Sequence, residues 1–249
     1  MSDFGLAGRT ALVTGATRGL GLAIAHKLCA GGVHVLVNYA HDDEAAKAAV
    51  AELGELPGSV DLVRADIATA EGSEQLVSAV RATGRRLDIL VHNAASWHPM
   101  SAIRADIADL HADITTAVDP LLRLAPALDE LMSARGRVLA VSSNGADRVI
   151  PGYVGLGTAK AALEALVRYL AVELAPRGIA VNAVSTAKLD KGPDTPNAAM
   201  VPVLAARTPA GRLTAPADVA DVVALLCAEE AAWIHGQVIT VDGGLGIRA

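Results

Sequence analysis

Short apolar runs alternate along the chain with longer stretches that have helical periodicity. The runs hold four to six residues and are rich in Val, Leu, Ile and Ala, which is typical of strands buried on both faces of a parallel sheet. They predict strands over residues 10–13, 33–37, 60–65, 87–91, 136–141, 179–184 and 237–241. The stretches between them predict helices over residues 20–30, 42–53, 71–83, 154–174 and 216–228, with further helical segments between 103 and 132 that are interrupted near Asp119–Pro120.

This alternation predicts an α/β fold, a Rossmann-type doubly wound parallel sheet of seven strands with helices on both faces. No internal repeat, linker or low-complexity segment divides the chain, so residues 1–249 are expected to form a single domain. One irregular stretch with four prolines, at about 185–212, interrupts the regular pattern.

The amino-acid composition argues against several classes of binding partner. Aromatic residues make up 2% of the chain and the net charge is -6, which argues against stacking on single-stranded nucleic acid and against binding to anionic nucleic acid or membrane surfaces. Cys29 and Cys227 lie in apolar helical patterns and are interpreted as buried small hydrophobes that form no disulfide. With no signal-peptide pattern at its start and no apolar run that could span a bilayer, the protein is expected to be cytoplasmic.

A glycine-rich stretch, Thr14 to Gly21, joins the first predicted strand to the first predicted helix. Gly15 allows a tight turn, Gly19 allows a backbone to approach a pyrophosphate closely, and Gly21 allows close packing of helix on strand. The free N–H groups at the start of the helix would then face the phosphates. The stretch therefore predicts a nucleotide site.

The spacing Thr-Gly-x-x-x-Gly-x-Gly resembles the cofactor loop of the short-chain dehydrogenase/reductase family. Tyr153 lies seven residues before Lys160, and this Tyr-x₆-Lys pattern resembles the enoyl-acyl-carrier-protein reductase branch. The likeness continues at residues 93–96, 160–174, 208–212 and 236–244. Together these motifs are similar to the third, short-chain-reductase-like type of bacterial enoyl reductase, over nearly the whole chain. The resemblance implies one dinucleotide-binding and catalytic domain, with the substrate segment at about 185–212.

The resemblance also implies the catalytic roles. Tyr153 would hydrogen-bond the thioester oxygen of a 2-enoyl substrate while hydride passes to the β-carbon. Lys160 would hold the nicotinamide ribose and favour a tyrosinate-like charge on Tyr153. Ser143, ten residues before Tyr153, is either an assisting polar group or a strand-end hydroxyl that bonds backbone.

NADPH is expected rather than NADH. The end of the second predicted strand, at residues 38–41, carries no carboxylate for a ribose 2′-hydroxyl, and Arg18 could pair with a 2′-phosphate. Asp42, Asp43 and Glu44 would repel that phosphate unless they point outward. The residues expected at the cofactor are Gly15, Thr17, Arg18, Gly19, Leu20, Gly21, Asn38, Tyr39, Ala40, Asp66, Ile67, Asn93, Ala94, Ala95, Lys160 and Thr186.

For two of these cofactor assignments the sequence also allows a purely structural role. Asp66 either caps the adenine pocket, as in the family, or is the N-cap of the next helix. Residues 93–95 either contact the cofactor or only stabilise the sheet.

The sequence departs from the family where substrate is chosen. Thr115 stands in the place of an Asn that helps relay protons, and residues 185–188 replace a glycine-containing nicotinamide loop, although Thr186 could still touch the carboxamide. Leu156 occupies the place of the tyrosine that other family members carry four residues before the lysine. Leu156 and Trp97 are candidate pocket residues, with surface cover as the alternative for Trp97.

Three functions follow. The first is an NADPH-dependent reductase of an enoyl thioester in fatty-acid or related acyl metabolism, with the substrate possibly carried on a protein. The second is a carbonyl reductase of specialised metabolism, and the third is a cofactor-binding protein without redox turnover. No metal site is expected from the histidine spacing. The resemblance implies a homotetramer built through the long helices.

Overall fold

The computed structural model describes residues 4–195 and 197–247. The start of the chain and Pro196 of the irregular segment, both used in the sequence analysis, lie outside the described residues. Within them the strands form one parallel sheet in the order β3-β2-β1-β4-β5-β6-β7. The strands are β1 Thr10–Val13, β2 His34–Tyr39, β3 Ser59–Arg64, β4 Leu87–His92, β5 Met132–Ser143, β6 Ala180–Thr186 and β7 Val238–Val241.

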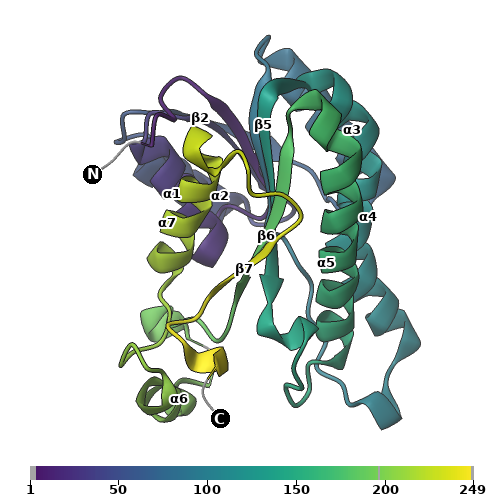
Figure 1. The fold of residues 1–249 in the computed structure, drawn as a ribbon, viewed down its shortest axis with the longest axis vertical. Helices are drawn as coiled ribbons and strands as arrows, with labels where there is room; N and C mark the ends of the chain where they lie inside the picture. The colour runs from purple at the N-terminus through teal and green to yellow at the C-terminus, as the bar shows by residue number, and fades with distance from the viewer. Residues whose placement is uncertain (1–3, 196, 248–249) are drawn as a thin grey trace.

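Helices cover both faces of this sheet, as the alternating pattern predicted. On one face lie α1, α2 and α7, and on the other lie α3, α4 and α5 (Figure 1). The helices are α1 Gly19–Ala30, α2 Asp43–Leu53, α3 Ala70–Ala82, α4 Ile107–Leu131, α5 Val154–Leu174, α6 Val201–Arg207 and α7 Pro216–Cys227. The doubly wound Rossmann-type fold is therefore confirmed.

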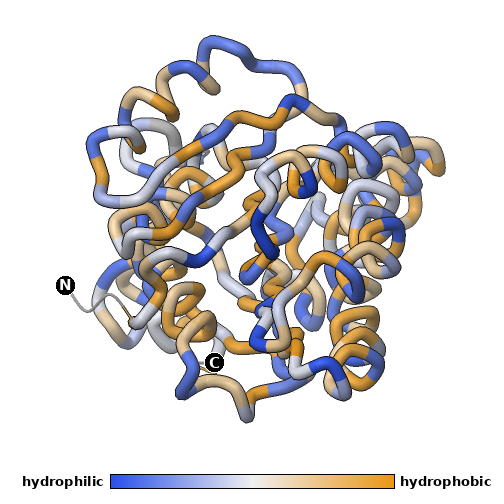
Figure 2. The backbone as a smooth tube through the Cα atoms, turned by 90° about the horizontal axis from the view of Figure 1, so that it is seen from above, coloured by the Kyte–Doolittle hydropathy of each residue, from blue (hydrophilic) through white to orange (hydrophobic). Residues whose placement is uncertain are grey.

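Each sheet face has its own apolar core, which explains why the strands are apolar at nearly every position. Along β1, Val13 packs with Ile24 of α1 and Val223 of α7, whereas its neighbour Leu12 packs with residues such as Leu121 of α4. Successive side chains of a strand point to opposite faces, so both must be apolar when both faces are covered. Figure 2 shows hydrophobic and hydrophilic residues alternating along the helices, since only one side of each faces the sheet.

The predicted interruption of the fourth helix is wrong. α4 runs unbroken from Ile107 to Leu131 although Pro120 and Pro126 lie inside it. A proline removes one backbone hydrogen bond and tends to kink a helix. Here Pro120 is buried, and the neighbouring Leu121 and Leu124 pack into the second core, so tertiary packing holds the helix together.

The predicted irregular segment is only partly irregular. β6 continues through Ser185 to Thr186, and α6 forms near the middle of the segment. Leu189 pairs with Thr214 in an isolated parallel bridge, which joins the beginning of the segment to the residues before α7. α6 lies beyond the carboxyl edge of the sheet, at the bottom of Figure 1.

Both cysteines are buried and free, as predicted. Burial raises the pKa of the Cys29 thiol to about 11 and that of Cys227 to about 12. None of the described helices combines the length and the apolar character that crossing a membrane requires.

Candidate active site

The site lies where the order of strands reverses. β1 and β4 are neighbours in the sheet, but the chain leaves them toward helices on opposite faces, which opens a crevice at their carboxyl ends. A cavity of about 820 Å³ occupies this place. Its lining residues are Arg18, Gly19, Leu20, Gly21, Asn93, Ala94, Ala95, Asp190, Lys191 and Pro216.

The three glycines of the loop after β1 meet the steric demands expected of them. Gly15 and Gly19 have φ angles of +62° and +55°, in the left-handed region that favours glycine. A Cβ on Gly21 would lie 2.1 Å from the carbonyl oxygen of Gly15, so no side chain fits between the loop and the first turn of α1.

Two asparagine side chains hold this loop from beneath. Asn93 Nδ2 donates to the carbonyl oxygens of Thr14 and Gly15, both at 3.0 Å. Asn38 Oδ1 accepts from the Gly15 N–H at 3.4 Å, and its amide donates to Ala65 O at 2.9 Å. Asn38 is buried. These contacts show both side chains supporting the loop, which is the structural alternative that the sequence left open for Asn93.

His92, which sequence reasoning did not single out, links β4, β1 and α4. Thr14 Oγ1 accepts from the N–H groups of Asn93 and Ala94, at 3.0 and 3.1 Å, so its own hydrogen is directed to His92 Nδ1 at 3.2 Å. His92 Nε2–H then donates to Ala117 O at 2.9 Å. Burial, together with the charge of Lys160, lowers the pKa of His92 to about 4. The ring is therefore neutral at pH 7 with its hydrogen on Nε2.

The three acidic residues near the end of β2 all form hydrogen bonds or ion pairs within the chain. Asp42 accepts from the Ala45 N–H at 2.9 Å as the N-cap of α2, and Glu44 pairs with Lys47 at 2.7 Å. Asp43 accepts from the Tyr39 hydroxyl at 3.0 Å and pairs with Arg64 at 3.3 Å. These partners reduce the repulsion that the three carboxylates would exert on a phosphate.

The alternative role of Asp66 as a helix N-cap is wrong. Thr69 is the N-cap of α3, because its side chain accepts from the Gly72 N–H at 2.9 Å. Asp66 instead accepts from the Ala68 N–H at 3.0 Å. Ile67 beside it is buried in the second core. Thr17 is half-buried in the glycine loop, and Ala40 is half-buried directly after β2.

Lys160 is buried on α5 with its ammonium beneath the end of β5. Nζ donates to Val141 O at 2.7 Å, which leaves two N–H groups for other partners. Burial lowers the pKa of Lys160 to about 8, although the charge of Glu164 opposes the shift. Glu164 in turn accepts from the Ser142 hydroxyl at 2.5 Å.

Tyr153 is the N-cap residue of α5, and its ring packs on Gly145. A Cβ on Gly145 would lie 2.5 Å from two ring carbons, so the tyrosine needs a glycine there. Ser143 Oγ accepts from the Gly145 N–H at 3.2 Å, and the Ser143 hydroxyl is near enough to Tyr153 to act on the pKa of its phenol. This geometry brings Ser143 and Tyr153 together.

The pKa of Tyr153 is raised, not lowered. Burial is the main cause and the charge of Asp113 adds to it, while the hydrogen bond with Ser143 acts in the opposite direction. The structure does not give Tyr153 the tyrosinate-like character that the sequence interpretation expected from Lys160. Tyr153 is a neutral phenol at pH 7, able to donate a hydrogen bond.

Trp97 and Leu156 lie in different surroundings. The ring centroids of Trp97 and Tyr153 are 6.3 Å apart, and Trp97 is 51% exposed. Leu156 is buried between α4 and α5 with Ala117 and Ala159. Trp97 can therefore contact a molecule that reaches Tyr153, whereas Leu156 belongs to the helix packing.

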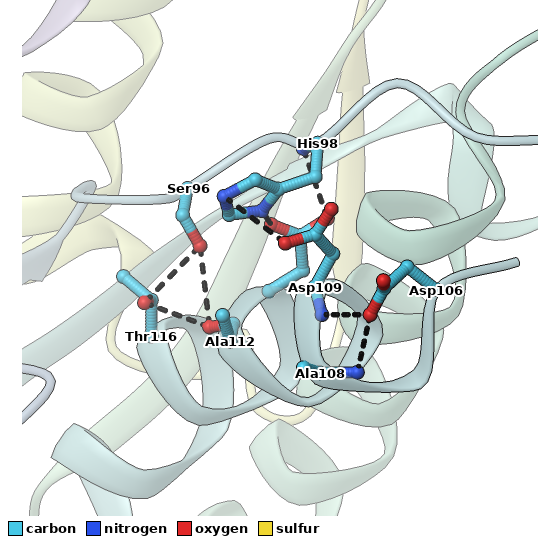
Figure 3. A network of polar contacts seen from close by, with 8 residues as sticks. Ser96, His98, Asp106, Ala108, Asp109, Ala112 and Thr116 are labelled. Carbon is cyan, nitrogen blue, oxygen red and sulfur yellow. Dashed lines mark hydrogen bonds and ion pairs between the residues drawn. The ribbon is translucent and has the colours of Figure 1, made fainter.

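A buried carboxylate lies near Tyr153 and was not predicted as a site residue. Asp113 is fully buried on α4 and accepts from His98 Nδ1 at 2.8 Å and from the His98 backbone N–H at 3.3 Å. The hydrogen bond to Asp113 raises the pKa of His98, and the charges of Asp109 and Asp106 add to this effect. Figure 3 shows His98 above the first turns of α4, with Asp109 on that helix and Asp106 at its N-cap. The signal in the sequence is an acid on the otherwise buried face of α4.

Thr115 and Thr186 lie in different surroundings. Thr115 is half-buried on α4. Thr186 is buried, and its hydroxyl donates to Val241 O of β7 at 2.9 Å, so only its oxygen lone pairs could meet a carboxamide. Among the residues that the structure describes, no group of three His, Cys, Asp or Glu side chains is placed to hold a metal ion.

The cavity suits the pyrophosphate of a dinucleotide. α1 begins at the cavity with no acidic residue in its first turn and with no side-chain cap, so its first N–H groups point toward an anion. Lys191 Nζ comes close to this loop, since it lies 3.6 Å from the point where a Cβ on Gly19 would be, the distance of an ordinary van der Waals contact.

Comparison with known proteins agrees with this site. Residues 15–246 match the family described as enoyl-(acyl carrier protein) reductase. The 1-cyclohexenylcarbonyl-CoA reductase of Streptomyces collinus is 38% identical over 250 residues, covering 97% of this chain and 88% of the relative. The 3-oxoacyl-(acyl-carrier-protein) reductase of Synechocystis is 34% identical over 243 residues, covering 96% and 98%. The structure of the angucycline C-6 ketoreductase LanV with bound NADP is 30% identical, covers 97% of each chain and has a TM-score of 0.89.

The match over most of the chain, the identity of these relatives and the shared fold lead to one assignment. The chain belongs to the short-chain dehydrogenase/reductase family of oxidoreductases.

Proposed function

We propose that this protein uses NADPH to reduce the C=C bond of a 2-enoyl thioester. The observation that carries the proposal is the position of Tyr153, seven residues before Lys160 and beside Ser143. Leu156, four residues before Lys160, is buried between helices and offers no hydroxyl. The likeness to the 1-cyclohexenylcarbonyl-CoA reductase of Streptomyces collinus supports the same reaction.

Each residue has a defined part in this reaction. NADPH, when bound, supplies the hydride that reaches the β-carbon. Tyr153, a neutral phenol, donates a hydrogen bond to the thioester oxygen as negative charge develops there. Lys160 uses the two N–H groups not bonded to Val141 to hold the ribose hydroxyls next to the nicotinamide. Ser143, beside Tyr153, would orient its hydroxyl through a hydrogen bond.

The preference for NADPH over NADH rests on charge at the end of β2. Arg18 lines the cavity and is exposed, and the nearby carboxylates of Asp42, Asp43 and Glu44 are taken up by other partners. Arg64 adds a second cation beside Asp43. A 2′-phosphate would therefore lie near positively charged side chains, and the nearby carboxylates, which already have partners, would repel it less.

A second candidate is reduction of a carbonyl group. The raised pKa of Tyr153 suits a phenol that protonates an alkoxide oxygen, which is a strong base. The similar Synechocystis protein is a 3-oxoacyl reductase and LanV is a ketoreductase. Both reactions would use the same hydroxyl of Tyr153 on different substrate atoms.

The test is NADPH consumption with a short 2-enoyl-CoA and with the matched 3-oxoacyl-CoA. We expect turnover of the enoyl compound, and a loss of about 10²–10³ in kcat for Tyr153→Phe, because the donor to the developing charge is removed. Tyr169→Phe is the matched control, since Tyr169 lies on the same helix outside the cavity and the variant keeps the aromatic ring. Its activity should equal that of the wild type.

Each other outcome has a definite meaning. Turnover of the 3-oxoacyl compound alone would favour the second candidate. Cofactor binding without turnover of either substrate would favour a binding protein. Full activity in Tyr153→Phe would contradict both reductase proposals.

A further inference from the structure

We propose that Lys191 is a further cofactor-binding residue, which contacts the pyrophosphate from the side opposite to α1. The inference rests on the proposed function in one respect, that the cavity receives a nicotinamide dinucleotide. It assigns a role to the unusual segment after β6, for which sequence reasoning had no interpretation.

The position of the ammonium group is the first observation. Lys191 Nζ lies 3.6 Å, and Cε 3.9 Å, from the point where a Cβ on Gly19 would be. Gly19 is the first residue of α1 and lies in the glycine loop. Lys191, Arg18 and Gly19 line the same cavity, so the amine lies beside the loop within the cavity assigned to the phosphates and would have to move outward to admit one.

The local charge is the second observation. The start of a helix carries partial positive charge, and α1 has no acidic residue in its first turn to offset it. Arg18, the N-cap residue of α1, makes no side-chain capping bond. A lysine directed at this end of a helix is unfavourable by itself and favourable when an anion lies between the two. The pyrophosphate carries the matching negative charge.

The carboxylate nearest to this lysine in sequence is already engaged. Asp190 Oδ1 accepts from the Gly192 N–H at 2.9 Å and from the Thr195 hydroxyl at 3.2 Å. Asp190 therefore closes the turn that presents Lys191.

The backbone of Lys191 is fixed, so its side chain has a defined origin. The Lys191 N–H donates to Thr195 Oγ1 at 2.6 Å, and the Asp190 N–H donates to Thr214 O at 2.9 Å. The bridge between Leu189 and Thr214 adds a second link to the residues before α7. Only the flexible side chain has to adjust to bring the amine onto a phosphate oxygen.

Lys191 and Arg18 should differ in which cofactor they recognise. The pyrophosphate is common to NADH and NADPH, whereas the 2′-phosphate belongs to NADPH alone. If Lys191 binds the pyrophosphate, its loss weakens both cofactors equally. If Arg18 binds the 2′-phosphate, its loss weakens NADPH alone.

The experiment measures the Kd of NADPH and of NADH, by fluorescence or calorimetry, for the wild type, Lys191→Gln and Arg18→Gln. We expect Lys191→Gln to weaken both cofactors by a similar factor, about tenfold for the loss of one charge-assisted hydrogen bond. The salt dependence of both affinities should become smaller. Arg207→Gln, which removes an exposed cation from the same segment outside the cavity, is the control for a general change in charge and should bind both like the wild type.

Several results would overturn the proposal. Unchanged affinities in Lys191→Gln, with an unchanged melting temperature, would exclude Lys191 from the cofactor site. Weakening of NADPH alone would move Lys191 to the 2′-phosphate. If the wild type bound neither dinucleotide, the proposed function itself would be wrong and the role of Lys191 would be lost with it, whereas the first two results leave the proposed function intact.

Discussion

The stability of the fold should depend on pH through His92, because only the neutral form of its imidazole ring fits the buried position that it occupies. Its pKa is about 4 in the folded chain, against 6.5 for an ordinary histidine, so the unfolded chain binds the proton first as the pH falls. The resulting stabilisation is fully present above pH 6.5 and is lost between pH 6.5 and 4, and it amounts to about 3 kcal/mol.

The measurement is urea unfolding of the wild type and of His92→Gln between pH 7 and 4. Glutamine can donate and accept but does not titrate in this range, so the free energy of unfolding of the variant should fall less steeply with pH. Equal slopes for the two proteins would show that His92 does not titrate as we expect.

Lys160 should set the alkaline limit of the reaction. Its pKa of about 8 means that the buried ammonium loses its proton as the pH rises past this value, and with the proton it loses a donor for the ribose hydroxyls. We expect kcat/KM to decline above about pH 8, since this ratio reports the pKa values of the free enzyme.

Glu164→Gln provides the matched test of this assignment. The charge of Glu164 raises the pKa of Lys160, so its removal should move the decline to lower pH. The bond from Ser142 can be kept by the amide oxygen of Gln. A profile that stays flat to pH 9.5, or a shift to higher pH in the variant, would contradict the role given to Lys160.

At the scale of elements, the contact between α4 and α5 is tight at Gly155. A Cβ at this position would lie 2.6 Å from Asp113 Oδ2 and 3.2 Å from Met100 Cε. We expect Gly155→Ala to destabilise the fold by about 1–3 kcal/mol, the usual cost of overpacking. It should also lower turnover, since α5 begins with Tyr153 as its N-cap.

Thermal unfolding and NADPH consumption measure both effects. Thr158→Ala, at an exposed position on the same helix, is the control and should leave both nearly unchanged. A Gly155→Ala protein with wild-type melting temperature and activity would show that Asp113 can move aside without consequence.

Regular elements were predictable from sequence because their apolar patterns are local. Strands such as β2 and helices such as α5 begin and end within a residue or two of their predicted bounds. One exception is α4, where Pro120 suggested an interruption and burial against neighbouring elements prevented one. Two others are β5, which begins at Met132 and not at residue 136, and α6, which forms within the segment predicted to be irregular. A local rule fails where packing from elsewhere in the chain decides.

In the candidate site too, the sequence reveals the residues that lie in local motifs and misses those that depend on distant contacts. Gly15, Tyr153 and Lys160 could be found because each lies within a short motif that resembles one of a known family. His92 is recognised only through Thr14, which is 78 residues away in the sequence. Lys191 is recognised only because the segment after β6 folds back over Gly19. A local sequence pattern does not indicate which residues that lie far apart in the chain will come into contact in the folded structure.

At the scale of the whole molecule, we propose that α4 and α5 form an interface between copies of this chain. Leu122 on α4 is 51% exposed, and Tyr169 and Val172 on α5 are 71% and 75% exposed. Large apolar side chains gathered on two adjacent helices are typical of association surfaces. The homotetramer implied by the family resemblance would cover them.

Light scattering of purified protein tests this assembly. We expect a mass near four times the 25.3 kDa of one chain, and a smaller species for Val172→Glu because a buried charge disfavours the interface. Leu225→Glu changes an exposed leucine on α7, on the other face of the sheet, and is the control. A monomeric wild type, or equal effects of both variants, would contradict the proposed interface.

The asparagines beneath the glycine loop have a consequence for the speed of binding. Because Asn38 of β2 and Asn93, directly after β4, fix the loop from the two strands on either side of β1, its shape is set when the chain folds and not when a nucleotide arrives. Little conformational entropy remains to be lost on encounter, so association should proceed in one step at a rate governed by diffusion and charge. The dissociation rate depends instead on the residues that contact the bound nucleotide from the side opposite to the loop.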